Sequence, residues 1–232
     1  MMINAIVEQI SDIGFGIFKG FYDNATIAKY SELCEKHSIS RPFTNADGQM
    51  IMVKSVKNLV AKTRDFDEFF SDSRLTSILE RILSPVDHWG IKISDTGIKN
   101  VVSGLRTSSM HRDDDLYPQL ARGKPFTVNS LLAIDPFSEE LGATKVVPGS
   151  HKWDHEVVQS EKAESVLLDP GDLLVMDGRT WHQAGKNIRE GESRRAVNVY
   201  YCAGWCQPGH GLHCGMTEAA FSQLPRKIKQ FL

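Results

Sequence analysis

The sequence predicts a mainly-β domain, either a sandwich or a barrel, with helices at its flanks. From about residue 88 onward, short runs rich in Val, Ile, Leu and Thr alternate with turn residues. Pro148-Gly149, Pro170-Gly171 and Gly191 each provide turn chemistry where a strand is expected to end. Seven or so short strands of this kind are typical of sandwiches and barrels. The candidate strands are HWGIKI, GIKNVV, FTVNSLLAI, TKVV, ESVLL, DLLVMD and AVNVYYCA.

The first third of the chain, by contrast, predicts helices. Residues 24–35 have apolar positions at helical spacing, with Asn24 or Asp23 available as the N-cap. Residues 66–83 place leucines and isoleucines on one stripe, and the Ser-Pro pair that follows is expected to stop the helix. A terminal helix packed on the β core is expected within residues 217–232.

Length and composition limit the possible classes of protein. The 232 residues fit one large domain, so we expect a single domain over residues 1–232 with a β core at about 88–203. A formal charge of −2 provides no basic field for nucleic acid. No run reaches the roughly 18 apolar residues of a membrane span. Four unevenly placed cysteines predict no disulfide scaffold, which favours a cytoplasmic protein with reduced thiols.

Two imidazoles and one carboxylate are candidate metal ligands. Residues two apart in a strand point to the same face, so His111 and Asp113 can point together into a barrel lumen. His182 is expected on a rigid hairpin, because the apolar strand LLVMD turns at Gly178 before it. Such a facial set leaves open positions on a non-haem Fe(II). The alternative for an isolated His-x-Asp triplet is a surface pair or a satisfied polar core group.

An arginine near His182 is a candidate carboxylate anchor. Arg194 begins the strand RRAVNVYY, which would run antiparallel to the His182 strand and could face the same lumen. A guanidinium offers a carboxylate two parallel charge-assisted hydrogen bonds. The period of two allows only one of Arg194 and Arg195 to point inward, and the alternative is a solvated pair in a charged turn.

Several motifs occur in order between roughly residues 100 and 202. They are His111-x-Asp113, Leu141-Gly142-Ala143-Thr144 leading to Val147-Pro148-Gly149-Ser150-His151-Lys152-Trp153, Pro170-Gly171-Asp172, and His182-Gln-Ala-Gly-Lys-Asn187 with Arg194. Taken together, they resemble the phytanoyl-CoA dioxygenase family of Fe(II)- and 2-oxoglutarate-dependent oxygenases.

The resemblance implies a double-stranded β-helix, a jelly-roll of the cupin type, with N-terminal helices and a C-terminal helix. It implies that His111, Asp113 and His182 hold Fe(II), and that Arg194 rather than Arg195 anchors the distal carboxylate of 2-oxoglutarate. The implied reaction uses molecular oxygen to oxidise, most simply to hydroxylate, a small-molecule metabolite or biosynthetic intermediate, while 2-oxoglutarate is decarboxylated to succinate. Desaturation, cyclisation and endoperoxide formation by relatives stay open, as does the oligomeric state.

The sequence departs from the resemblance at one position. Many relatives have a serine or threonine two residues after the distal histidine, whereas this chain has Ala184. Thr127 is a candidate substitute for binding the cosubstrate, with Asn129 on the same strand face, although both also suit ordinary strand packing. Halogenating relatives replace the iron carboxylate by Gly or Ala, so the intact Asp113 disfavours halogenation.

Two other classes of protein are compatible with these residues. The chain could be a cupin-like metal-binding module, or a catalytically silent relative without oxygenase activity. Scarce basic residues between positions 115 and 126 weakly disfavour a CoA substrate.

Other polar groups are expected to be structural. His151 belongs to a hairpin corner, and Asp114 and Asp115 are expected to be solvated or paired with Arg112. A last group suits either zinc or, more simply, a loop beside the pocket. Its members are Cys202, Cys206, His210, His213 and Cys214.

Overall fold

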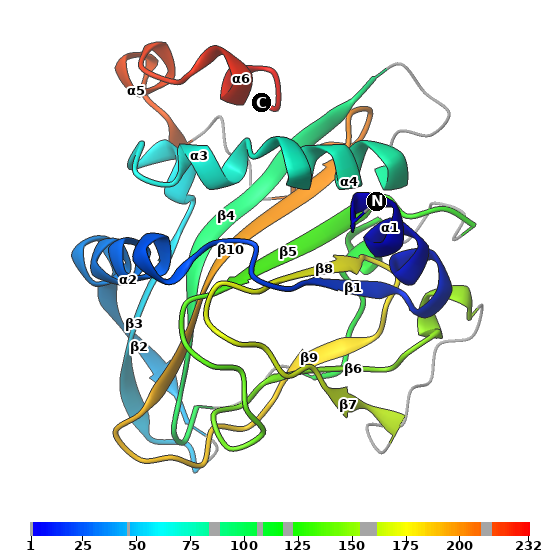
Figure 1. Ribbon diagram of the computed structural model, residues 1–232. Helices are drawn as coiled ribbons and strands as arrows, with labels where there is room; N and C mark the ends of the chain where they lie inside the picture. Colours follow the sequence, from blue (N-terminus) through cyan, green and yellow to red (C-terminus); the bar gives the residue numbers. More distant parts are fainter. Residues whose placement is uncertain are drawn as a thin grey trace.

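The strands form two antiparallel sheets packed against each other (Figure 1). The large sheet has seven strands in the order β1-β8-β5-β10-β4-β3-β2, and the small sheet has three in the order β7-β6-β9. The computed structural model describes residues 2–45, 47–83, 89–105, 109–117, 123–153, 162–209 and 215–232. The strands are β1 (Phe15–Phe18), β2 (Ile39–Thr44), β3 (Met50–Lys57), β4 (Ile91–Val102), β5 (Thr127–Ala133), β6 (Thr144–Val146), β7 (Glu164–Ser165), β8 (Leu173–Asp177), β9 (His182–Ala184) and β10 (Ser193–Ala203).

Two hydrophobic cores lie on opposite faces of the large sheet. Alternate residues of β8 belong to different cores, because successive side chains of a strand point to opposite faces. Leu173 and Val175 pack in the core under the helices, whereas Leu174 and Met176 pack between the two sheets. The large sheet is therefore apolar on both faces, and the small sheet covers part of one of them.

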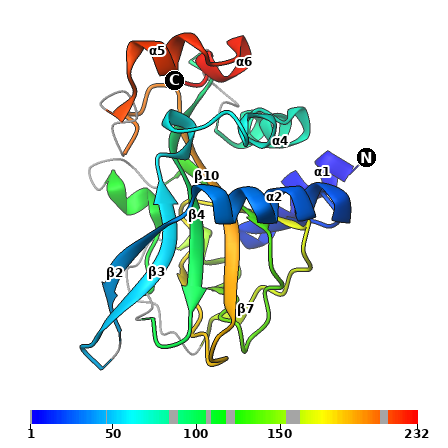
Figure 2. The same ribbon diagram turned by 90° about the vertical axis from the view of Figure 1, so that its left-hand side faces the viewer.

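Helices cover the outer face of the large sheet, as Figures 1 and 2 show. None of the helices in the described ranges has the length and apolar character that crossing a membrane requires. The α-helices are α1 (Met2–Ile13), α2 (Asn24–His37), α3 (Asp67–Phe70), α4 (Ser73–Leu83), α5 (Glu218–Ser222) and α6 (Arg226–Lys229), and the 3-10 helices are η1 (Leu59–Ala61), η2 (Asp113–Leu116) and η3 (Ser150–Lys152).

Helix α2 is present where the sequence predicts it, and the Asp23 side chain caps it by accepting from the Thr26 backbone N–H at 2.8 Å. The predicted helix over 66–83 is instead two helices, because the Asp72 side chain accepts from the Arg74 N–H at 2.8 Å and so starts α4. The expected stop at residues 84 and 85 lies outside the described residues.

The C-terminal segment differs from its prediction in a similar way. It forms the two short helices α5 and α6 rather than one, and Pro225 stands at the N-cap of α6. Proline has no N–H and clashes with the preceding turn, so a single helix cannot run through this position. Leu224, Ile228 and Phe231 still pack into the helical core, as the sequence predicts for a terminal helical element.

The β core begins well before residue 88, which corrects the predicted boundary. Strand β1 pairs with β8, and β3 pairs with β4, so three strands of the large sheet come from the first third of the chain. Strand β2 is exposed at nearly every position and contains Pro42, so it has no apolar alternation to reveal it. The runs HWGIKI and GIKNVV are predicted as two strands, whereas the single strand β4 runs without interruption from Ile91 to Val102.

Candidate metal and cosubstrate site

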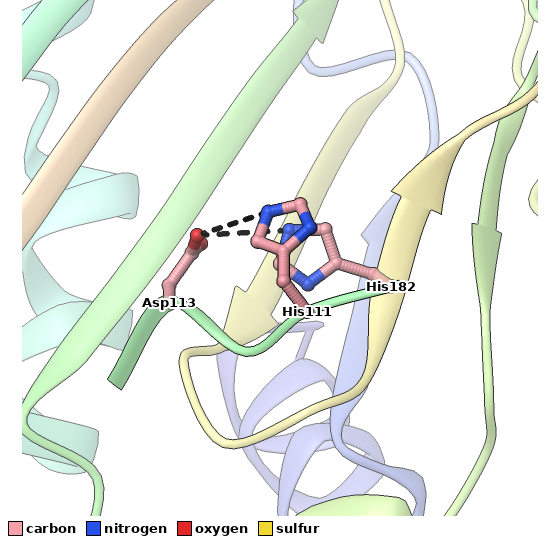
Figure 3. Close-up of side chains that lie close together, drawn as sticks. All are labelled: His111, Asp113 and His182. Carbon is pink, nitrogen blue, oxygen red and sulfur yellow. Dashed lines mark ion pairs between the residues drawn. The ribbon is translucent and has the colours of Figure 1, made fainter. Parts of the chain in front are cut away.

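His111, Asp113 and His182 come together with their side chains pointing toward one another (Figure 3). His111 is not in a regular strand, but forms an isolated bridge in which its backbone exchanges two hydrogen bonds with His182, at 3.0 and 2.9 Å. Asp113 begins the 3-10 helix η2. The side chains of His111 and Asp113 therefore converge because the chain bends after the bridge, and not because both lie on one strand face as the sequence predicts.

His182 also reaches the site by a different route from the predicted hairpin. The apolar strand β8 belongs to the large sheet, whereas β9, which begins with His182, belongs to the small sheet. The chain crosses between the sheets at Gly178, whose N–H bonds to the Thr127 carbonyl at 2.9 Å. In the small sheet β9 pairs with β6 and not with β10.

The geometry of these three side chains suits a metal ion. Asp113 Oδ1 lies 3.7 Å from Nε2 of each histidine, and one ligand atom from each residue lies within 4.8 Å of the others. The exposed fraction of the side chain is 43% for His111, 14% for Asp113 and 8% for His182. The group is therefore open on the His111 side and closed on the His182 side, which leaves room for further ligands.

Hydrogen bonds aim one nitrogen of each imidazole at the centre of the group. Nδ1 of His111 lies 2.8 Å from the Ser109 carbonyl, and Nδ1 of His182 lies 2.9 Å from the Thr180 carbonyl. A carbonyl only accepts, so Nδ1 carries the proton and Nε2 keeps the lone pair that binds a metal. Burial lowers the pKa of His182, which further favours its neutral form.

Two asparagines on neighbouring strands orient the carboxylate of Asp113, one by direct contact and the other through the first. Asn129 of β5 donates from Nδ2 to Asp113 Oδ2 at 3.0 Å, and Asn198 of β10 donates to the Asn129 side-chain oxygen. This leaves Asp113 Oδ1 free to face the two imidazoles. The sequence indicated Asn129 only as a strand-face neighbour, and it gave no signal for Asn198 because the pairing of β5 with β10 is not visible in the sequence.

Arg194 lies in the interior with an unused donor. It is 2% exposed and donates from Nη2 to the Gly142 carbonyl at 2.8 Å, and among the residues that the structure describes its Nε has no hydrogen-bond partner. Its guanidinium also lies 4.1 Å from the centre of the Phe137 ring. Burial lowers its pKa to about 10, so the side chain still carries its charge at neutral pH. A buried cation without a counter-ion is costly unless an anion binds there.

Arg195 points to the other face of β10. It makes two hydrogen bonds to the Asp135 carboxylate, at 2.8 and 2.7 Å, and another to the Ser31 hydroxyl at 2.9 Å. Of the two arginines, the structure thus places Arg194 inward and pairs Arg195 outside.

A cavity of about 400 Å³ connects the three candidate ligands with Arg194. Thr144 of β6 lies directly across from Ala184 of β9 and lines this cavity, so a hydroxyl stands beside the position where the sequence lacks one. Thr127 does not line the cavity, because its hydroxyl is fully buried and donates to Asp114. The placement of Thr127 therefore does not fit the predicted role in cosubstrate binding, and Thr144 was missed because it lies on another strand.

The remaining polar groups are mostly structural. Asp114 is not solvated as predicted, but is buried and accepts from the Phe126 N–H at 3.0 Å, whereas Asp115 pairs with Arg112 at 2.9 Å. His151 bonds to the Ser11 carbonyl at 3.0 Å.

Only part of the cysteine and histidine cluster near the C-terminus can be placed. Cys202 and Cys206 are both buried, and Trp205 lies against Phe126, with 5.5 Å between the ring centres. His210, His213 and Cys214 lie outside the described residues.

Comparisons with known proteins support the same interpretation. The sequence model of the phytanoyl-CoA dioxygenase (PhyH) family matches residues 11–196. The chain is 32% identical over 198 residues to the dioxygenase cdmA of Talaromyces verruculosus, covering 78% of this chain and 67% of that protein. It is 30% identical over 209 residues to the multifunctional dioxygenase ausE of Emericella nidulans, covering 83% of this chain and 70% of that protein.

A solved structure shows the same fold. It is the non-heme alpha ketoglutarate dependent epimerase SnoN from nogalamycin biosynthesis, with a TM-score of 0.70 at 17% identity, covering 86% of this chain and 82% of that one. SnoN has also been solved with Fe3+, alpha ketoglutarate and nogalamycin RO. The predicted jelly-roll fold, family and enzyme class are thereby confirmed. The chain belongs to the phytanoyl-CoA dioxygenase family and is an Fe(II)- and 2-oxoglutarate-dependent dioxygenase.

Proposed function

We propose that His111, Asp113 and His182 bind the Fe(II) of this dioxygenase, and that Arg194 binds the distal carboxylate of 2-oxoglutarate. The observation that carries the proposal is the shared cavity, in which three convergent ligand atoms and one buried cation with an unused donor lie together. Two neutral imidazoles and one carboxylate suit Fe(II) with open positions, and a guanidinium suits a carboxylate. The residues present therefore fit both groups.

The chain's own residues supply binding and orientation. Nε2 of each histidine and Oδ1 of Asp113 would hold the metal, while Asn129 fixes the second carboxylate oxygen. Arg194 would offer Nε and Nη atoms to the cosubstrate, and the Thr144 hydroxyl would donate to the same carboxylate. Bound Fe(II) supplies the activation of molecular oxygen, with decarboxylation of 2-oxoglutarate to succinate and oxidation of the substrate.

Further parts of the proposal concern the domain, the substrate and the location. Residues 1–232 act as one oxygenase domain, since one helical core includes residues from α1 to Phe231. The substrate is a small molecule, and hydroxylation is the simplest outcome. A cytoplasmic location is supported by the free thiols of Cys34 and Cys202, because oxidising compartments favour disulfides.

The test is Fe(II) binding and succinate formation in wild type and in His111→Ala, with His37→Ala as the matched control. His37 is a partly buried histidine that pairs with Asp65 at 2.6 Å and does not line the cavity. We expect His111→Ala to lose both the visible absorption of the anaerobic Fe(II) and 2-oxoglutarate complex and the formation of succinate, and His37→Ala to keep both. Normal 2-oxoglutarate turnover by His111→Ala would show that the ligand assignment is wrong.

A further inference from the structure

Two lysines line the exposed end of the cavity, Lys57 of β3 and Lys99 of β4. In the described part of the chain, neither ammonium forms an ion pair with a carboxylate. Other lysines of the same region do have such partners, as Lys54 on the opposite face of β3 pairs with Glu35 at 2.6 Å. The two cavity lysines thus keep their charge available to a ligand.

The register of the sheet brings these two lysines close together. Lys57 pairs with Gly97, and Lys99 lies two residues farther along β4, so both side chains belong to the same face. Diagonal neighbours of this kind have backbone positions about 7–8 Å apart, within reach of two long side chains. Gly97 places no side chain between them. Two like charges at this distance repel each other, and an anion bound between them removes that repulsion.

The surroundings of Lys57 are positive as well. The Lys62 ammonium donates to the Lys57 carbonyl at 2.6 Å. Burial, followed by the charge of Arg41, lowers the pKa of Lys62, and the carboxylate of Asp95 offsets part of this shift. The cavity is also lined by the carboxylate of Asp113. This carboxylate accepts a hydrogen bond from Asn129 and faces the histidines, so it does not neutralise the lysines. The open end of the cavity is therefore cationic.

The wall beside the lysines is largely apolar. Val53 of β3, Val101 of β4, Phe43 of β2 and Leu105 line the cavity together with the polar Ser55 and Asn100. A ligand that fills this space meets an apolar surface along its body and two ammonium groups at one end. Given the proposed function, on which this step rests, we propose that the substrate is an amphipathic small molecule whose anionic group, a carboxylate or a phosphate, binds to Lys57 and Lys99.

The same register sets the distance between the anionic group and the oxidised carbon. Lys57, Gly97 and Asn198 form one row across three strands, and Asn198 contacts Asn129, which holds Asp113. Neighbouring strands lie about 4.8 Å apart, so the backbone of Lys57 is roughly 10 Å from that of Asn198. An anionic group bound near Lys57 would thus lie across β4 from the Asn198 end of the row, which favours oxidation at a carbon removed from that group.

The test uses three probes of equal chain length, decanoate, decyl phosphate and decanol, titrated calorimetrically into the metal-free protein. Since one exposed ion pair raises affinity up to about fivefold, two lysines should give at least one anion about a tenfold preference over decanol at low salt. The preference should shrink at high salt. Whichever anion binds more tightly identifies the group as a carboxylate or a phosphate.

The double variant Lys57→Ala/Lys99→Ala should lose the preference while still binding decanol, and Lys54→Ala should keep it as the matched control. Equal affinity for the three probes, no binding of any probe, or a preference that survives the double substitution contradicts the proposal. Failure of the proposed function looks different, because the wild-type protein would then not bind Fe(II) and 2-oxoglutarate at all. Failure of this inference alone leaves that binding intact.

Discussion

Replacing Arg194 by methionine separates cosubstrate binding from stability. Arg194 is almost fully buried, and burial lowers its pKa from 12.5 to about 10. At about 1.4 kcal/mol for each pH unit, the charged side chain costs the ligand-free fold about 3 kcal/mol at neutral pH. Because the pKa of this arginine is depressed in the folded state, the cost is fully present below about pH 10 and is lost progressively as the pH rises from about 10 to 12.5. Arg194→Met removes the buried charge, so its free energy of unfolding should equal or exceed that of wild type.

Binding should change in the opposite direction. Removing one partner of a desolvated charge pair costs about 2–5 kcal/mol, which raises the KM for 2-oxoglutarate about 30-fold to several thousandfold. The assay is succinate formation against 2-oxoglutarate concentration, beside urea unfolding of the same protein.

Arg195→Met is the matched control for this experiment. It removes two hydrogen bonds to Asp135, which should lower the free energy of unfolding by about 1–3 kcal/mol. Its KM for 2-oxoglutarate should stay within about twofold of wild type. Equal rises in KM for the two variants, or none for Arg194→Met, would refute the assignment of Arg194 as the anchor.

Three further changes test other parts of the site and the fold. Asn129→Ala should weaken Fe(II) binding about 10- to 100-fold in a metal titration, because Asp113 loses its orienting donor, and unchanged affinity would count against that role. Thr144→Val should raise the KM for 2-oxoglutarate about tenfold while Thr144→Ser does not, and equal values for both variants would reject the hydroxyl. Burial raises the pKa of Asp67 to about 6, so ionising this carboxyl group in the folded state is unfavourable. The unfolding free energy of wild type should therefore fall by up to about 3 kcal/mol as the pH rises from about 4 to 6. In urea unfolding, Asp67→Asn should lack this fall. If the variant and wild type showed the same dependence of unfolding free energy on pH, Asp67 would not be its source.

The strands after residue 88 were predictable because each carries its own signal. Strand β5 has the β-branched and apolar residues of FTVNSLLAI, and β8 follows the turn at Gly171, whose φ is 95°. Strand β1 has only four residues, and β2 is exposed on both faces, so neither carries a period that a sequence can show. The helix break at Asp72 depends on one capping hydrogen bond, which helical periodicity alone does not reveal.

The candidate site was predictable wherever the chemistry is local. His111 and Asp113 are neighbours in the sequence, and a period of two separates Arg194 from Arg195. Partners that meet only through sheet pairing were not predictable, as Thr144 stands opposite Ala184 and Asn198 reaches Asn129 from another strand. Thr127 was predicted to bind the cosubstrate from its place at the start of a strand. Its hydroxyl instead donates a hydrogen bond to the buried Asp114.

An anomalous difference map at the iron edge tests the central claim most directly, from crystals soaked with Fe(II) and 2-oxoglutarate without oxygen. One strong peak is expected at coordination distance from His111, Asp113 and His182, with the cosubstrate running from that peak to the guanidinium of Arg194. A peak confined to the segment from Cys202 to Cys214, or no peak between the two histidines, would contradict the assignment of the metal centre.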